Sequence, residues 1–299
     1  MLNAPRHPYT RSLVAAVPSL VPARRRTAAS GEPALETRRL NKTFRSGGGL
    51  LGGTARLVHA VKDVSLRLLR GETLGVVGES GSGKSTIARL IVRIVAADSG
   101  TVQLGDVDVL SLSASRIRPY RKRIQMVFQD PYGSLNPRHK VGRLIAEGMI
   151  VHGAARPAAY ARAGELLELV GLDAGVAERF PHEFSGGQRQ RIGIARALAL
   201  DPEILVADEP VSALDVSVQA QVLDLLATIR DRLGLTMLFI THDLRVAAQV
   251  CDRIAVMHRG ELVEYGDTAD LFADPRHAYT RELLSAVPGR GWVAPVFSD

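Results

Sequence analysis

Short apolar runs, bounded by glycine, proline and charged residues, recur along the chain and predict an α/β protein. Thr73–Val77 and Ile204–Ala207 are largely apolar runs of strand length, the pattern of strands buried on both faces of a parallel sheet. The stretch IARLIVRIV at 87–95 follows the first run, and apolar positions at helical spacing over 192–199 precede the second. Helices are therefore expected to flank the sheet. No apolar run approaches the length of about 18 residues that spans a bilayer.

A glycine-rich loop lies between the first apolar run and the helical pattern after it. Residues 78–85 read GESGSGKS and match G-x-x-x-x-G-K-S, in the strand–loop–helix order that a phosphate-binding loop requires. Glycines let backbone N–H groups converge on phosphate oxygens, and the helix N-terminus adds its positive end. Lys84 would reach the β and γ phosphates, and Ser85 can ligate magnesium; the alternative is a purely structural turn. The predicted nucleotide-binding residues are Gly78, Ser80, Gly81, Gly83, Lys84, Ser85 and Thr86.

Two acidic residues, Asp208 and Glu209, end the second apolar run. A carboxylate at the end of a buried strand is costly unless it serves a cation or a water molecule. Asp208 suits a magnesium shell, and Glu209 suits the base that orients an attacking water. Such a pair alone is a weak signal, and the phosphate-binding loop strengthens it.

The segment FSGGQRQR at 184–191 precedes a helical pattern and places a hydroxyl and free N–H groups at a helix start. Ser185, Gly186, Gly187 and Gln188 could form a second anion-binding device. By spacing alone, an ordinary capped helix explains the segment equally well.

Together these motifs resemble those of the ATP-binding cassette (ABC) ATPases. GESGSGKST resembles the Walker A motif, Gln129 in VFQD the Q-loop, SGGQ the signature, ILVADE the Walker B motif, Asp215 in SALD the D-loop, and His242 in FITHD the H-loop. The resemblance implies a P-loop NTPase fold with a RecA-like core, an antiparallel β region at its N-terminal side and a helical insert. It also implies ATP and Mg²⁺ as ligands.

The resemblance assigns roles to residues that their own chemistry leaves open. Gln129 would contact magnesium and the attacking water, although an isolated loop glutamine is ordinarily solvated surface. His242 would hold Glu209 and the γ-phosphate, although a histidine after an apolar strand is ordinarily a core or loop residue. Asp215 would lie at a dimer interface, or it could cap a helix. In the family two such domains pair head to tail, so that Ser185 and Gly187 would serve the nucleotide bound to the partner.

Phe44, in LNKTFRSGG, occupies the approximate place of the aromatic residue that stacks on adenine in these ATPases. Such stacking on a base is worth ~1–3 kcal/mol. The glycine-rich stretch at 46–54 lengthens the spacing from Phe44 to Gly78. A packing phenylalanine in a strand is the alternative.

Composition and charge narrow the functional classes. The net charge is +7, but residues 1–31 supply five of these charges through arginines and contain no acid, so the basicity belongs to the leader rather than to the predicted core. A solvated linker explains such a leader, and an anionic membrane surface or nucleic acid is the alternative. The single cysteine, Cys251, excludes an internal disulfide framework and a multi-cysteine metal site within this chain.

The chain carries the same short segment twice. At an offset of 270 residues, Pro5–Pro18 and Pro275–Pro288 are identical at ten of fourteen positions. This tail, like QDPYGSLNPR at 129–138, resembles the oligopeptide and dipeptide importer branch, whose ATPases end in such an extension. We expect residues 1–31 to be the tail of an upstream ATPase domain plus a linker. A self-contained subunit with a duplicated tail is the alternative.

The expected organisation follows: a leader at 1–31, an ABC ATPase domain at 32–270 with a helical insert at 132–187, and an importer-type extension at 271–299. The expected function is ATP hydrolysis that powers import of peptides or related solutes from the cytoplasmic face of the membrane. The expected partners are a second ATPase domain, membrane permease subunits and, indirectly, an extracytoplasmic solute-binding protein. Nucleic acid is not expected as a partner. The alternatives are an exporter ATPase and an ATP switch acting on nucleic acid or ribosomes.

Overall fold

The computed structural model describes residues 7, 18–22, 31–46 and 56–287. Most of the first tail copy, the arginine-rich part of the leader, the glycine-rich stretch at 47–55 and residues 288–299 lie outside the described residues. Expectations on those segments therefore remain expectations. Within the described residues, no helix has both the length and the apolar character needed to cross a membrane.

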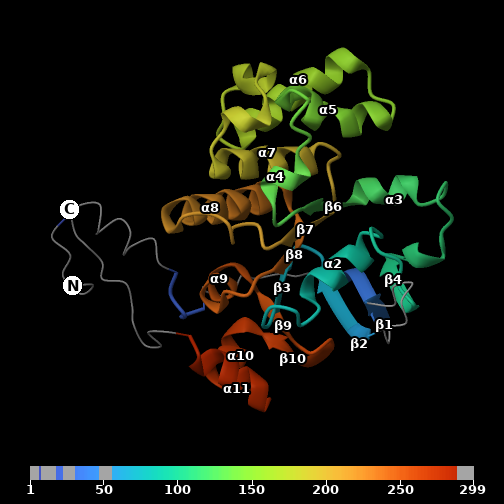
Figure 1. Ribbon diagram of the computed structural model, residues 1–299, viewed down its shortest axis with the longest axis vertical. Helices are drawn as coiled ribbons and strands as arrows, with labels where there is room; N and C mark the ends of the chain where they lie inside the picture. Colours follow the sequence, from blue (N-terminus) through green and yellow to red (C-terminus); the bar gives the residue numbers. More distant parts are fainter. Residues whose placement is uncertain (1–6, 8–17, 23–30, 47–55, 288–299) are drawn as a thin grey trace, which may run out of the picture.

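A six-stranded sheet in the order β10-β9-β3-β8-β7-β6 forms the centre of the molecule (Figure 1). Neighbouring strands from β9 to β6 are parallel, and β10 is antiparallel to β9. The strands are β3 (Thr73–Val77), β6 (Ile124–Val127), β7 (Ile204–Asp208), β8 (Thr236–Ile240), β9 (Arg253–His258) and β10 (Glu261–Asp267). Both predicted strands are present, and the prediction of a mainly parallel sheet is confirmed.

A second, antiparallel sheet in the order β2-β1-β4-β5 lies on the N-terminal side of the fold. Its strands are β1 (Pro33–Ser46), β2 (Arg56–Leu69), β4 (Ser99–Leu104) and β5 (Val107–Asp108). The β1–β2 pairing contains several register shifts, as expected where a long hairpin bends. The antiparallel region implied by the family resemblance is therefore confirmed.

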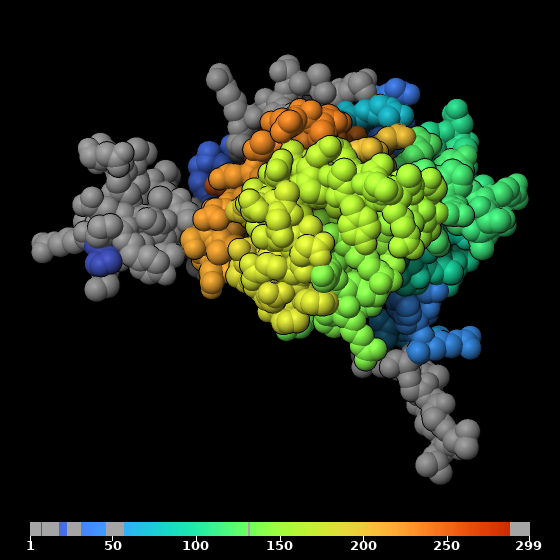
Figure 2. All heavy atoms as spheres, turned by 90° about the horizontal axis from the view of Figure 1, so that it is seen from above, coloured from blue at the N-terminus to red at the C-terminus, as the bar shows by residue number. Residues whose placement is uncertain are grey.

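Helices cover the central sheet and form a separate layer above it (Figure 1). The α-helices are α2 (Lys84–Ile91), α3 (Arg118–Arg123), α4 (Pro131–Ser134), α5 (Val141–Val151), α6 (Arg156–Leu169), α7 (Gly186–Leu198), α8 (Val216–Leu233), α9 (Leu244–Val250), α10 (Thr268–Ala273) and α11 (Ala278–Ser285). Short 3₁₀ helices span Val109–Ser111, Ala174–Glu178 and Pro181–Glu183. Seen from above, the segment from α5 to the start of α7 makes up most of the exposed face (Figure 2).

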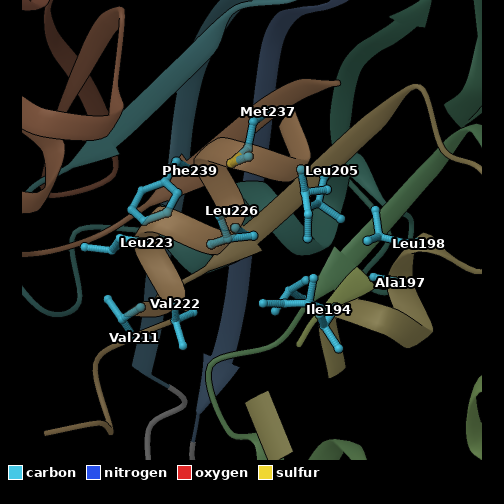
Figure 3. Close-up of a cluster of buried hydrophobic side chains, with 14 of the residues drawn as sticks. Ile194, Ala197, Leu198, Leu205, Val211, Val222, Leu223, Leu226, Met237 and Phe239 are labelled. Carbon is cyan, nitrogen blue, oxygen red and sulfur yellow. The ribbon is translucent and has the colours of Figure 1, made fainter. Parts of the chain in front are cut away.

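Two apolar cores lie on opposite faces of the central sheet, which explains why its inner strands β3, β7 and β8 are buried along their whole length. In β8, Met237 and Phe239 belong to one core, whereas Leu238 and Ile240 belong to the other. This alternation follows from the period of two along a strand. The first core is closed by α7 and α8, whose side chains meet those of β7 and β8 (Figure 3).

The helix after the glycine-rich loop is shorter than its apolar pattern predicts. The stretch 87–95 continues the pattern, but α2 ends at Ile91. Arg93 adopts a positive φ of 54°, which ends the helical path, and its guanidinium donates hydrogen bonds to the carbonyls of Val109 and Leu112. The contacts of Arg93 with the 3₁₀ helix at Val109–Ser111 and with the loop after it thus accompany the end of α2.

Candidate active site

Four loops that carry predicted functional residues meet at one edge of the central sheet. The glycine-rich loop follows β3, His242 follows β8, Glu209 follows β7 and Gln129 follows β6. These four strands are adjacent and parallel, so their carboxyl ends lie at the same edge. The topology thereby brings together residues that are far apart in the sequence.

Backbone contacts on its outer side define the shape of the glycine-rich loop. Gly78 has a φ of 146°, and a Cβ there would lie 2.2 Å from the carbonyl oxygen of Met257. Gly83 has a φ of 105°, and its Cβ would lie 2.2 Å from the carbonyl oxygen of Ala60. Both positions need glycine for conformation and for space. The loop is therefore pressed against neighbouring backbone and leaves its inner side open.

Lys84 is the first residue of α2, and its ammonium group is held by the loop itself. Its Nζ donates hydrogen bonds of 2.8 Å to the carbonyl oxygens of Gly78 and Glu79. The residue is 4% exposed, and burial lowers the pKa of Lys84, partly offset by the nearby carboxylates of Glu209 and Asp208. A cation at this position favours an anionic ligand such as a phosphate.

Ser85 and Asp208 form the second contact at this edge. The Ser85 hydroxyl donates a 2.8 Å hydrogen bond to Oδ1 of Asp208, which is 1% exposed. Burial raises the pKa of Asp208, with partial compensation from that hydrogen bond. A buried carboxylate beside a hydroxyl beneath a phosphate-binding loop is a donor set that suits Mg²⁺, which is typically bound by one or two carboxylates plus phosphates and water.

Glu209 occupies a strained position between two polar partners. Its φ is 45°, a left-handed value that is uncommon for a residue with a side chain, and its N–H donates to the carbonyl of Ile240. Oε2 accepts a hydrogen bond of 2.9 Å from the amide of Gln129 and lies 3.2 Å from Nδ1 of His242. The backbone thus turns this carboxylate away from the buried strand and towards the loops at the sheet edge.

These residues line one cavity of about 920 Å³. Its lining contains Gly78, Ser80, Gly81, Gly83, Lys84, Ser85, Thr86, Gln129, Glu209 and His242. Asp208 lies directly behind Ser85 and lines a smaller adjoining cavity together with Gln129. Apart from Asp208, the residues predicted from the Walker motifs, the Q-loop and the H-loop therefore surround one space.

The predicted signature residues do not line this cavity. Ser185 is the N-cap of α7: its hydroxyl accepts from the N–H of Gln188, and the Gln188 side chain accepts from the N–H of Ser185. Gly186 and Gly187 form the first turn, and a Cβ at Gly187 would lie 2.3 Å from Val218. The capped helix start is therefore present, and the anion-binding role of this segment stays a prediction.

Asp215 and Phe44 also lie outside the cavity. Asp215 is at the N-cap position of α8, yet its side chain makes no capping hydrogen bond. Phe44 lies in β1 and is 38% exposed, with Nζ of Lys42 5.5 Å from its ring centre. Its cross-strand partner Val58 lines the cavity instead. Of the two strands of the hairpin, β2 therefore lines the cavity and β1 does not.

Sequence reasoning missed several residues that contribute to the cavity wall. Val58, His59, Ala60 and Lys62 come from β2, Arg259 comes from the β9–β10 turn, and Leu283 comes from α11. No motif marks the residues of β2 or the turn. The tail repeat retains Leu13 at the place of Leu283, but nothing in that repeat indicates that α11 lies at the cavity.

The fold and the site define a phosphate-loop nucleoside triphosphatase. The family described as "ABC transporter" matches residues 61–212, and the family described as "Oligopeptide/dipeptide transporter, C-terminal region" matches residues 1–46 and 263–291. The chain belongs to the ABC transporter family and carries its ATPase domain. The two separate matches to the C-terminal region coincide with the two copies of the tail.

Curated relatives include the "Glutathione import ATP-binding protein GsiA" of Salmonella paratyphi A. It is 45% identical over an alignment of 313 residues that covers 96% of this chain and 50% of the relative. The protein of the same name from Shigella flexneri is 45% identical over 314 residues with the same coverage. The chain thus spans about half the length of the curated relatives it matches.

Solved structures share the fold. The dimeric ATP-binding cassette MJ0796 in a post-hydrolysis state, bound to ADP and Pi, superposes with a TM-score of 0.69 at 30% identity and covers 78% of this chain and 98% of its own. CbiO1 from Clostridium perfringens, described as part of the ABC transporter complex cbiONQ, has a TM-score of 0.67 at 27% identity and covers 81% of this chain and 92% of its own.

Proposed function

We propose that the chain binds and hydrolyses ATP to power the import of peptides or related small solutes through a membrane ABC transporter. The observation that carries the ATPase part is the convergence of Lys84, Ser85, Gln129, Glu209 and His242 on one cavity. The import part is supported by the two matches to the oligopeptide/dipeptide transporter C-terminal region and by relatives named for glutathione import.

The proposed mechanism follows from the chemistry of the site. Backbone N–H groups of the glycine-rich loop and the N-terminus of α2 bind the phosphates, and the ammonium of Lys84 turns from its two carbonyl partners to the β and γ phosphates. Glu209 accepts a proton from the attacking water as the water approaches the γ-phosphate. His242 holds the carboxylate of Glu209 and the γ-phosphate in position.

Ser85, Asp208 and Gln129 are the residues that would hold Mg²⁺. When bound, the ion neutralises charge that develops on the phosphates. The amide nitrogen of Gln129 donates to Glu209 in this structure, which leaves the Oε1 atom as the one that would bind the ion. Asp208 would be the least mobile of the three ligands, because it is buried at the end of β7.

A second ATPase domain completes the proposed site. The start of α7, at residues 185–188, does not line this chain's own cavity. These residues would therefore bind the nucleotide of a head-to-tail partner, and Asp215 would lie at the shared interface. Membrane permease subunits and an extracytoplasmic binding protein are the further proposed partners. The chain would act as a peripheral protein on the cytoplasmic face of the membrane.

The leader is proposed to be the tail of an upstream ATPase domain, followed by a linker. The repeat itself and the match of the C-terminal transporter region to residues 1–46 support this. Intact mass of the native product, recovered from membranes with an antibody to this domain, tests it. A product about the size of the full curated relatives is expected. A product of the size of this chain would contradict it.

Stimulation of ATP turnover distinguishes import from the alternatives. Phosphate release is measured for the chain alone, with its permease subunits in liposomes and with DNA, RNA or ribosomes. Acceleration by the permease subunits, increased further by a loaded binding protein, is the expected result. Acceleration by nucleic acid alone would overturn the import proposal while leaving the ATPase assignment intact.

A further inference from the structure

The C-terminal extension reaches the phosphate-binding loop directly. Tyr279, in the first turn of α11, is 7% exposed, and its hydroxyl accepts a 3.1 Å hydrogen bond from the backbone N–H of Glu79. Leu283, one turn further along α11, lines both the main cavity and a second cavity that it shares with His242. The tail therefore lies against the loop after β3 and the loop after β8.

The bonded peptide group is one of the two whose carbonyl oxygens hold Lys84. The N–H of Glu79 and the C=O of Gly78 belong to the same trans peptide, so they point in opposite directions within one plane. The N–H of Glu79 donates to the Tyr279 hydroxyl, and Nζ of Lys84 donates a 2.8 Å hydrogen bond to the C=O of Gly78. Gly78 has a φ of 146° and no side chain, so its backbone can rotate more freely than that of other residues. Contacts from outside the loop are therefore needed to hold the Gly78–Glu79 peptide in one orientation.

Tyr279 is itself firmly held. Its ring stacks on His258 with ring centres 3.9 Å apart and planes 16° apart. Its N–H donates to Nδ1 of His277, the N-cap of α11, and the Glu264 carboxylate accepts from the N–H groups of Arg276 and His277.

The turn that begins at His258 contacts the loop a second time, because the N–H of Gly260 donates to the carbonyl of Ser82. Tail and turn form one rigid support behind the loop.

We propose that Tyr279 is a positioning residue for ATP binding: its hydroxyl fixes the Gly78–Glu79 peptide and thereby the ammonium of Lys84. The inference rests on the nucleotide site proposed above. It assigns a role in nucleotide affinity to the C-terminal extension. The tyrosine recurs as Tyr9 in the other tail copy, as expected if the same support serves each ATPase domain.

The test compares Tyr279→Phe with Tyr265→Phe. Each variant removes one tyrosine hydroxyl that is bonded to backbone, but Tyr265 donates to the carbonyl of Arg67 and does not line the cavity. Equilibrium ATP binding, the kcat of the assembled transporter and the melting temperature are measured for both variants. Hydrogen exchange at the Glu79 amide reports on the loop itself.

Tyr279→Phe is expected to raise the Kd for ATP about fivefold, in keeping with one lost hydrogen bond, and to leave kcat at saturating ATP within about twofold. Exchange at Glu79 should accelerate. Tyr265→Phe should lower the melting temperature comparably without changing Kd. Unchanged affinity in Tyr279→Phe, or equal weakening in both variants, would overturn the proposal. A wild-type chain that binds no ATP would instead remove the nucleotide site on which it rests.

Discussion

The amide of Gln129 donates a 2.9 Å hydrogen bond to the carboxylate of Glu209, although 80 residues separate the two in sequence. They meet because β6 and β7 are adjacent parallel strands that end at the same edge. The proposed base is therefore bonded to the loop that leads into the helical layer. Displacement of that loop would break the bond and change the position of the carboxylate.

Glu209→Gln is expected to bind ATP normally and to lose turnover by a factor on the order of 10² to 10⁴, because the amide cannot accept a proton from water. The substitution is isosteric, so the contacts with Gln129 and His242 have counterparts in the variant. Phosphate release and ATP binding are measured side by side. Glu178→Gln, on the exposed surface, is the control. Steady-state turnover equal to wild type in Glu209→Gln would remove Glu209 from the mechanism.

Asp208→Asn should make the nucleotide-free and metal-free protein more stable at neutral pH while abolishing Mg²⁺-dependent hydrolysis. The charged carboxylate is buried, and a neutral amide can still accept from Ser85; the gain expected is about 1 kcal/mol. Thermal unfolding measures the gain, with the exposed turn variant Asp106→Asn as control. A lower melting temperature for Asp208→Asn at neutral pH would contradict this account.

The stability difference between Asp208→Asn and wild type should depend on pH, and the direction of that dependence can be predicted. Burial raises the pKa of Asp208 in the folded state, so the native protein binds this proton more tightly than the unfolded chain. The contribution of Asp208 to stability therefore falls as pH rises from its ordinary pKa through the raised value. The stability difference between Asp208→Asn and wild type should vanish at acidic pH, where Asp208 is neutral, and should grow towards neutrality. A difference that is constant across this range would disprove the assignment.

Gly83→Ala should abolish ATP binding, since the new Cβ would meet the carbonyl oxygen of Ala60 at 2.2 Å. Gly234→Ala is the matched control: it also has a positive φ, 63°, at the end of α8, but no atom lies within 4 Å of its Cβ position. The control should lose about 1 kcal/mol of stability and keep its affinity for ATP. Equal affinities in the two variants would show that the close approach at Gly83 does not shape the loop.

The sequence predicts the loops and helix starts of this candidate site because each motif is local. The Walker A loop, the acids after β7 and the N-cap of α7 are encoded in short segments, and each forms as expected. Which of them share a cavity depends on strand order, which no short segment contains. That order is seen only in the folded chain.

Other contacts could not be predicted from sequence, for a physical reason. Tyr279 and Glu79 are 200 residues apart, and their contact depends on how the tail packs on β9 and β10. The family resemblance predicts Phe44 as the residue that stacks on adenine, whereas the residue of the hairpin that lines the cavity is its partner Val58 on the neighbouring strand. Directly paired residues lie on the same face of a sheet, so the choice depends on which of the two strands lies next to the cavity.

Equilibrium binding of ATP with Mg²⁺ to the wild-type chain and to Lys84→Ala tests the central claim most directly, with Lys122→Ala on the surface helix α3 as control. Wild type and Lys122→Ala should bind equally, and Lys84→Ala should bind at least about tenfold more weakly, because a charge-assisted hydrogen bond to phosphate is lost. Equal affinity in all three proteins, or no binding by wild type, would contradict a nucleotide site at this edge of the sheet.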